Sequence, residues 1–112
     1  MSHWNKGSIV VIPFPFTDLT NTKKRPALVI ADLEGDDVIL SQITTSSNRQ
    51  DEYAVPLSQA DLDEGSLKVE SLIRTNKIFT AAEDIIIYKI GTINAAKMEE
   101  VQNKLTDLFT KR

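Results

Sequence analysis

The sequence predicts an α+β protein in which short antiparallel strands are followed by a single C-terminal helix. β-branched and aromatic residues occur in several short runs that turn-forming residues separate. Hydrophobic residues take up the spacing of an amphipathic helix only near the end of the chain. Strands that precede one helix, rather than alternating with helices, are typical of α+β folds with a mainly antiparallel sheet.

The first predicted strand, residues 8–16, is rich in β-branched and apolar residues. Pro13 and Pro15 cannot donate hydrogen bonds to a sheet, so the second half of this strand must lie at an edge or leave the sheet. Residues 17–24 are polar and predict a loop.

Three further strands are predicted in the middle of the chain. Residues 26–31 form an unbroken apolar run, which indicates burial on both faces. A turn at 32–36 joins this strand to the next one, at 37–44, as a hairpin. After a polar loop at 45–51, residues 53–57 can form a short strand that its proline keeps near an edge.

The next segments are a short accessory helix and two more strands. Residues 58–63 begin with a serine N-cap and predict one helical turn. A strand at 71–79 places Arg74 and Lys77 on opposite faces, so it carries these cations to solvent or to a site. The last strand is predicted at 84–90, ended by a glycine.

The predicted C-terminal helix begins at Ala95, after the good N-cap residue Asn94. Acidic residues occur early in it and basic residues late, as the helix dipole favours. We expect it to pack on the sheet through one apolar stripe. The stripe consists of Met98, Val101, Leu105, Leu108 and Phe109.

The length and composition describe one globular domain. The 112 residues, 41% of them hydrophobic, are enough to bury a core and show no internal repeat or boundary. We therefore expect a single domain over residues 1–112, with 1–6 flexible. The absence of cysteine excludes disulfides and thiolate metal sites. No segment resembles a signal peptide or a membrane span, so a soluble cytoplasmic protein without membrane contact is expected.

Several enzyme classes are excluded by the motifs that the sequence lacks. It contains no HExxH, no Gly-rich phosphate loop and no GxSxG motif. The single histidine, His3, lies near the terminus, so catalysis by a histidine pair is not expected. No clear carboxylate pair comes from different strands, and we expect neither a metal nor another cofactor.

The strongest local charge feature is a run of three cations, Lys23, Lys24 and Arg25, which enters an apolar strand through Pro26. The net charge of −3 argues against broad nucleic-acid binding but is compatible with a small cationic site. A basic loop held by a buried strand could present charge to a polyanion. A solvated loop with charges that protect a strand edge explains the pattern equally well.

Cations and hydroxyls also gather at predicted strand ends. Arg25 precedes the second strand, Thr44 and Thr45 end the third, and Arg74 and Lys77 lie in the fifth. A guanidinium presents a planar fork to phosphate, and a threonine hydroxyl can donate to a non-bridging oxygen. Such a set could bind a phosphodiester and stabilise the charge that forms when an RNA 2′-hydroxyl attacks phosphorus.

Four short motifs follow one another along the chain: Gly7-Ser8-Ile9-Val10, Lys24-Arg25-Pro26-Ala27-Leu28-Val29-Ile30, Gln42-Ile43-Thr44-Thr45 and Lys89-Ile90-Gly91. In order and spacing they resemble the MazF/PemK family, the toxin halves of type II toxin–antitoxin pairs. The resemblance extends over roughly residues 7–109, and the Arg-Pro and Ile-Thr motifs are its most specific parts.

The resemblance implies an SH3-like β-barrel with accessory helices that forms a homodimer. It also implies a metal-independent, sequence-selective endoribonuclease that cleaves single-stranded RNA and is inhibited by a cognate antitoxin, through which any DNA contact would be made. By motif position the implied catalytic pair is Arg25 and Thr44, with Thr45 as the alternative threonine. The residues expected to bind RNA are Lys23, Lys24, Thr45, Arg49, Arg74 and Lys77.

The chain departs from the family pattern at two places. Ser8 stands where the family commonly has aspartate, and the loop before Arg25 lacks the glycine and glutamate of many members. The general base is therefore left open, with Asp18 as an acidic residue of that loop. The alternative function is a non-catalytic toxin that binds a protein target, as the gyrase-poisoning toxins of similar fold do, or an inactive antitoxin-binding regulator.

Overall fold

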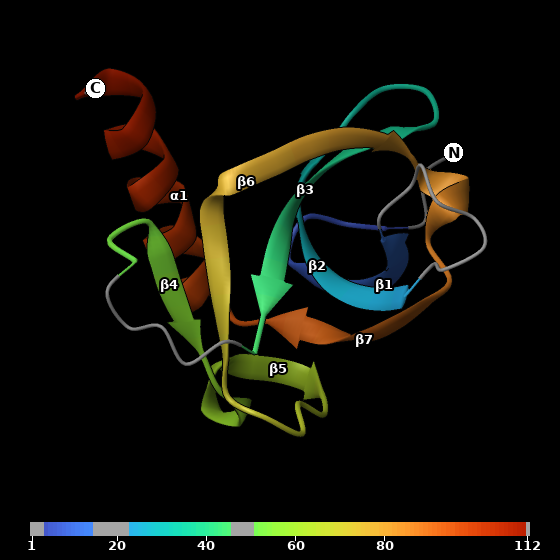
Figure 1. Cartoon of the computed structure of the whole chain (residues 1–112), viewed down its shortest axis with the longest axis horizontal. Helices are drawn as coiled ribbons and strands as arrows, with labels where there is room; N and C mark the ends of the chain where they lie inside the picture. Colours follow the sequence, from blue (N-terminus) through green and yellow to red (C-terminus); the bar gives the residue numbers. More distant parts are fainter. Residues whose placement is uncertain (1–3, 15–22, 46–50, 112) are drawn as a thin grey trace.

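The computed structural model describes residues 4–14, 23–45 and 51–111. Within them, one seven-stranded antiparallel sheet is joined by a single α-helix and two short 3₁₀ helices (Figure 1). The elements in chain order are β1 (Ser8–Phe14), β2 (Lys23–Asp32), β3 (Asp37–Thr44), β4 (Ala54–Leu57), η1 (Gln59–Asp61), β5 (Leu62–Gly65), β6 (Ser71–Ala82), η2 (Glu83–Ile85), β7 (Tyr88–Ile93) and α1 (Ala95–Thr110).

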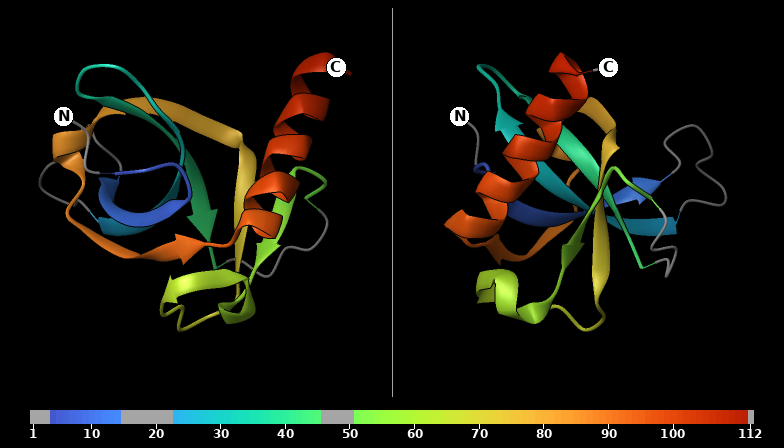
Figure 2. Two further views of the ribbon diagram at one scale, coloured as in Figure 1. Left: turned by 180° about the vertical axis from the view of Figure 1, so that it is seen from behind. Right: turned by 90° about the vertical axis from the view of Figure 1, so that its left-hand side faces the viewer.

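The sheet has the strand order β4-β6-β3-β2-β1-β7-β5 and is strongly curled. Figures 1 and 2 show β6 and β7 on opposite sides of an open barrel, with α1 lying beside β4 and β6. These features confirm the predicted α+β class, a small antiparallel barrel with a C-terminal helix. The predicted accessory helix is present as the single 3₁₀ turn η1.

Two apolar clusters occupy the two faces of the curled sheet, because successive strand residues point to opposite sides. The helix-side cluster joins the sheet to α1 and consists of Ile9, Leu28, Ile43, Val55, Leu57, Ile73, Ile93, Met98 and Val101. The barrel-side cluster consists of Val10, Ile12, Ala27, Val29, Val38, Leu40 and Ile86, with Trp4 and Phe79 packed against it. Each buried aliphatic side chain of this kind stabilises the fold by about 1.5–3 kcal/mol.

The prolines of β1 have the effect that the sequence predicts. Within β1, only Ser8–Val11 pair with β7, whereas Pro13 pairs with Lys24 of β2 alone. The second half of β1 is therefore an edge on its β7 side, as expected; Pro15 lies outside the described residues. β4, which contains Pro56, is likewise an edge strand.

The predicted loop at 17–24 extends too far, because β2 already begins at Lys23; residues 17–22 lie outside the described residues. Lys23, Lys24 and Arg25 extend the strand and pair with the second half of β1. Backbone pairing with β1 outweighs the low strand propensity of lysine and arginine here. The expected burial on both faces is confirmed for the centre of β2, where Ala27–Val29 are fully buried.

The strand boundaries in the C-terminal half also differ from the prediction. Residues 62–65, predicted partly as a helical turn and partly as a break, form β5 and pair with β7. β7 spans Tyr88–Ile93 instead of 84–90, and Gly91 lies inside it rather than ending it. Gly65 and Gly91 are paired, and a Cβ on either would overlap the backbone of the other strand. Glycine here permits the close approach of two strands instead of ending a strand, as the sequence prediction assumed.

α1 begins as predicted, since the side chain of Asn94 accepts a hydrogen bond from Lys97 N at 2.8 Å. Met98 and Val101 are buried, and Leu105 packs against the same cluster. Phe109 is 68% exposed, which corrects its assignment to the buried stripe. The reason is that the C-terminal end of α1 extends beyond β4 (Figures 1 and 2), so its last turn has no sheet to cover.

An exposed ion pair connects β5 to β7. Lys89 Nζ lies 3.0 Å from Glu64 Oε1, and the Thr92 hydroxyl donates to the same oxygen at 2.8 Å. The hydrogen bond from Lys89, followed by the one from Thr92, lowers the pKa of Glu64 from its ordinary value of 4.5.

Glu64→Gln is therefore expected to reduce the acid sensitivity of the fold slightly. A carboxylate whose pKa is lower in the folded state stabilises it above the unfolded pKa, and this contribution is lost as the pH falls through the folded value. Thermal unfolding between pH 7 and 3 should show a smaller decline for the variant. Identical declines for both proteins would contradict the assigned pair; the effect is small because the site is exposed to solvent.

Candidate active site

Arg25 lies in β2 immediately before Pro26, is exposed, and pairs with Ile12 of β1. Alternation along β2 places its side chain on the same face as Ala27 and Val29, two members of the barrel-side cluster. Arg25 is thus the first exposed polar residue of this face when β2 is followed from its buried centre towards its N-terminal end. Its backbone is held by the β1 ladder, which positions the guanidinium at the end of the barrel.

Thr44 is the last residue of β3, is half-buried, and pairs with Leu72 of β6. On its other side β3 pairs with β2, and the last paired residues are Ala27 and Gln42. Continuing this register by two residues sets Thr44 opposite Arg25. The last β2–β3 pair thus lies two residues from both Arg25 and Thr44, so the two predicted catalytic residues lie near the same ends of two neighbouring strands.

The alternative threonine, Thr45, follows the end of β3 and is exposed. It lies outside the ladder, so no strand register orients it. Thr44 is the threonine that the register aligns with Arg25.

Gln42 belongs to the same face but was not among the site residues predicted from the sequence. It pairs with Ala27 of β2 on one side and with Arg74 of β6 on the other. Along β3 it follows Leu40 of the barrel-side cluster and precedes Thr44 at two-residue spacing. The sequence signal that could have found it is this spacing from Thr44 within a predicted strand.

Arg74 shares the row of Gln42, but its side chain is already engaged. Its Nε lies 3.3 Å from Asp51 Oδ2, and Asp51 Oδ1 accepts a hydrogen bond from Tyr53 N at 2.9 Å. The side chain of Arg74 is 34% exposed. This arginine therefore anchors the approach to β4 and retains only part of its surface for a ligand.

A large bulge in β6 follows Arg74. Gln42 pairs with Arg74 and Ser41 with Ile78, so three residues of β6, Thr75 to Lys77, are inserted opposite one step of β3. β6 bends sharply along its length in Figure 1. The buried Thr75 hydroxyl donates to Tyr53 O at 2.6 Å and anchors the bulge. Lys77 is exposed within the bulge, so the register does not place it beside Arg25, Gln42 or Thr44.

Asp51→Ala is expected to destabilise the fold by about 1–2 kcal/mol, because the Tyr53 amide and the Arg74 guanidinium both lose their acceptor. Urea unfolding would measure the change. Asp63→Ala, at an exposed acidic residue of β5, is the control and should change stability by less than about 0.5 kcal/mol. Equal effects of the two substitutions would show that Asp51 anchors nothing.

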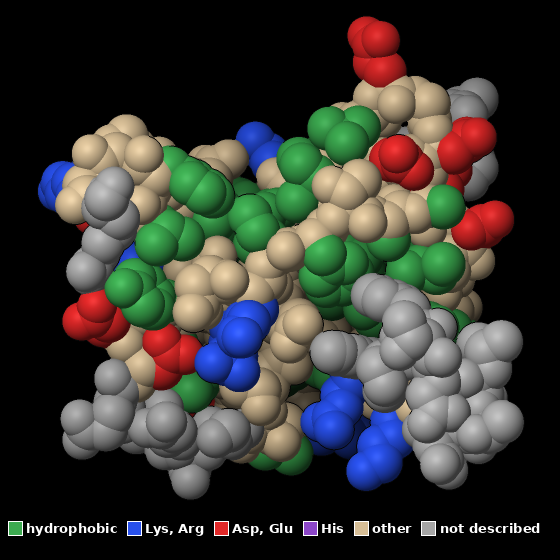
Figure 3. Space-filling view, turned by 45° about the horizontal axis from the view of Figure 1, so that its top comes forward, with side chains coloured by type: hydrophobic (Ala, Val, Ile, Leu, Met, Phe, Trp, Pro, Cys, Tyr) green, Lys and Arg blue, Asp and Glu red, His purple; other side chains and the backbone are tan. Residues whose placement is uncertain are grey.

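The other cations predicted to bind RNA are distributed unevenly. Lys23 and Lys24 are exposed on β2, and alternation places Lys23 on the face of Arg25 and Lys24 on the other face. Arg49, Asp18 and His3 lie outside the described residues. In Figure 3 basic side chains occur in small separate groups among hydrophobic and acidic ones.

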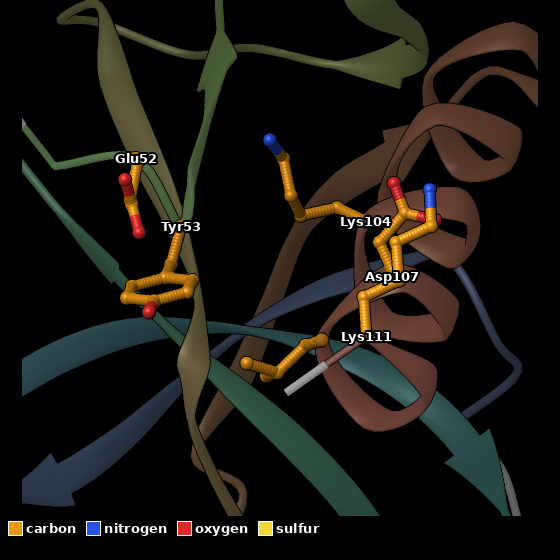
Figure 4. Close-up of a pocket in the computed structure, with 6 residues that line it drawn as sticks. Glu52, Tyr53, Lys104, Asp107 and Lys111 are labelled. Carbon is orange, nitrogen blue, oxygen red and sulfur yellow. The ribbon is translucent and has the colours of Figure 1, made fainter.

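A separate groove of about 280 Å³ lies between the approach to β4 and the end of α1 (Figure 4). It is lined by Glu52, Tyr53, Lys104, Asp107, Leu108 and Lys111. None of the predicted catalytic residues lines it, and its two lysines are balanced by two acids. The groove therefore has no chemical relation to the Arg25–Thr44 face.

In the part of the chain that the structure describes, no group of three or more histidine, aspartate or glutamate side chains is arranged to hold a metal ion. No helix in those residues is long and apolar enough to cross a membrane.

The fold defines a small curled antiparallel barrel of the α+β class, with polar residues at the ends of β2 and β3. Residues 5–109 match the family model described as PemK-like, MazF-like toxin of type II toxin–antitoxin system. The chain therefore belongs to this family, and the resemblance seen in its motifs is confirmed. No curated protein is significantly similar to it in sequence.

Solved structures of similar fold carry related descriptions. The toxin MazF-mt6 of Mycobacterium tuberculosis superposes with a TM-score of 0.70 at 18% identity, covering 91% of this chain and 95% of the other. A mycobacterial endoribonuclease in complex with its cognate antitoxin gives 0.71 at 16%, covering 97% and 95%. MazF from Deinococcus radiodurans gives 0.68 at 18%, covering 94% of each chain. At these identities the likeness establishes the fold.

Proposed function

We propose that this protein is the toxin of a type II toxin–antitoxin pair and cleaves single-stranded RNA without a metal ion. Family membership and the endoribonuclease descriptions of similar structures support the reaction class. The observation that supports the proposal is the β2–β3 register, in which Ala27 pairs with Gln42; continued by two residues, it would set Arg25 opposite Thr44. A guanidinium and a hydroxyl on neighbouring strands can both donate hydrogen bonds to a phosphodiester.

In the proposed reaction the RNA 2′-oxygen attacks the adjacent phosphorus while the bond from phosphorus to the 5′-oxygen breaks. The Arg25 guanidinium neutralises the charge that builds on the phosphate and gives a proton to the leaving 5′-oxygen. The Thr44 hydroxyl donates to a non-bridging oxygen. A guanidinium is a poor general base, so another group takes the 2′-proton. The products are a 2′,3′-cyclic phosphate, or its opened form, and a 5′-hydroxyl.

Three of the other predicted cations, Lys23, Arg74 and Lys77, are proposed to hold the RNA backbone. Lys23 shares the face of Arg25 on β2, and the exposed Lys77 and the partly exposed Arg74 lie on β6, on the other side of β3. Phosphate contacts of this kind give affinity that falls with salt, whereas the chemical step depends on groups at the reacting phosphate.

Lys23→Ala is expected to weaken RNA binding without stopping cleavage. The plot of log affinity against log salt should become less steep by about 0.7 for one lost phosphate contact with single-stranded RNA. Lys24→Ala, on the opposite face of the same strand, is the matched control and should change the slope less. A loss of cleavage at saturating RNA would contradict a backbone-binding role for Lys23.

The proposed assembly is a homodimer that an antitoxin inhibits. An antitoxin accompanies one of the similar endoribonucleases. Mass measurement of the purified chain, alone and with the product of any adjacent reading frame, would determine both associations.

The deciding experiment is incubation of the purified protein with a long mixed-sequence RNA in EDTA. Cleavage that yields 5′-hydroxyl ends at a restricted set of sequences would support the proposal. An RNA that stays intact, with or without added Mg²⁺, would overturn it and favour the alternative of a toxin that binds a protein target.

A further inference from the structure

The polar row that contains Arg25 and Thr44 has an uncharged member whose chemistry the proposed reaction does not use. Gln42 lies on the barrel-side face and follows the fully buried Leu40. Its side chain is half-buried. Within the described residues no hydrogen bond of its carboxamide is present, in contrast to Ser41, whose hydroxyl donates to Arg74 O at 2.8 Å.

The position of Gln42 relative to the reacting groups follows from the strand ladder. Two residues of an extended strand advance about 6.7 Å, so its backbone lies roughly that far from Thr44 on the same face. Its direct partners are Ala27, whose small side chain leaves room beside it, and Arg74, which Asp51 holds. The ladder therefore places the backbone of Gln42 two residues from Thr44, with Arg74 beside it on β6 and Ala27, two residues from Arg25, beside it on β2.

A carboxamide can donate to a phosphate, but its paired donor and acceptor match a nucleobase edge more fully. It offers a donor and an acceptor side by side, whereas a phosphate offers acceptors alone. Adjacent donor and acceptor atoms occur on nucleobase edges, as at adenine N6 and N7, and single-stranded RNA presents these edges to proteins. Arg25, Lys23 and Arg74 can supply the charge that the backbone requires.

We propose that Gln42 is a specificity-determining residue that reads the edge of a nucleobase next to the scissile phosphate. The inference rests on the proposed RNA cleavage and adds to it the group that selects the site. It follows that the sequence preference of this protein has one position that depends on a single carboxamide in β3.

The test compares base preferences rather than total activity. Gln42→Met keeps the size of the side chain and removes both hydrogen-bonding groups. Sequencing the 5′-hydroxyl ends from a mixed RNA pool should show the preference at one position falling about tenfold, with the other positions unchanged. Gln102→Met on α1 is the matched control, since α1 packs on the helix-side cluster on the other face of the sheet. It should leave every position unchanged.

A second variant and a second readout keep the outcomes distinct. Gln42→Glu retains the shape but turns the donor into an acceptor, so the same position should shift towards bases that present a donor there. Both substitutions are also placed in an Arg25→Ala background, and the RNA that binds is selected from a random single-stranded pool. Cleavage or binding with unchanged base preference in both variants would overturn the role of Gln42 alone. Wild-type protein that neither cuts nor binds RNA would overturn it together with the proposed function.

Discussion

Replacing Arg25 with alanine is expected to lower the rate of RNA cleavage by at least about 10²–10³-fold, the usual loss when one donor to a developing oxyanion is removed. The cause is local, because the guanidinium is exposed and extends from a strand whose backbone pairs with Ile12. Removing it leaves both apolar clusters intact, so the unfolding free energy should change by less than about 0.5 kcal/mol. Single-turnover cleavage of an RNA that contains one mapped site gives the rate.

Two matched variants separate chemistry from charge. Arg25→Lys keeps the positive charge but loses the planar fork, so it should recover binding and little of the rate. Lys24→Ala removes the neighbouring cation on the opposite face of β2 and should leave the cleavage rate within a few-fold of wild type. Full activity of Arg25→Ala, or an equal loss in Lys24→Ala, would show that the aligned arginine is not the catalytic one.

The architecture was predicted from local sequence patterns. These patterns were sufficient to predict a structural feature where the residues that determine it lie in one segment of the chain. The hairpin of β2 and β3, the edge position of Pro13 and the N-cap Asn94 all follow from turn chemistry or from the missing amide of proline. The family motifs identified Arg25 and Thr44 as a pair. Their alignment is a property of the register, which the sequence alone did not define.

The features that the sequence did not reveal depend on contacts between distant segments. The extension of β2 through Lys23 and Arg25 arises from pairing with β1, against the preference of these polar side chains for a loop. The bulge at Thr75 is stabilised by Tyr53, 22 residues earlier, and neither residue has a local signal for it. In the sequence Gln42 is distinguished only as part of a motif, because its relation to Ala27 and Arg74 exists only across strands.

Gly65→Ala is expected to be among the most destabilising single substitutions in the described part of the chain, with a loss of about 3 kcal/mol. Gly65 has a φ of +93°, and an added Cβ would overlap Ile90 O and the Cα of Gly91. Backbone atoms in the middle of β7 cannot move aside as a flexible side chain would. The strain of the positive φ and the overlap therefore add, and β5 must separate from β7 to relieve the overlap.

Gly35→Ala is the control that isolates the overlap from the backbone strain. Gly35 has a similar φ of +84° in the β2–β3 turn, and nothing lies within 4 Å of the position of its Cβ. It should lose only the conformational part, about 1 kcal/mol. Urea unfolding of both variants gives the difference, and amide exchange should accelerate at β5 and β7 in Gly65→Ala alone. Equal losses would mean that the close approach of the two strands contributes nothing. The positive φ alone would then determine the free-energy cost of alanine at both positions.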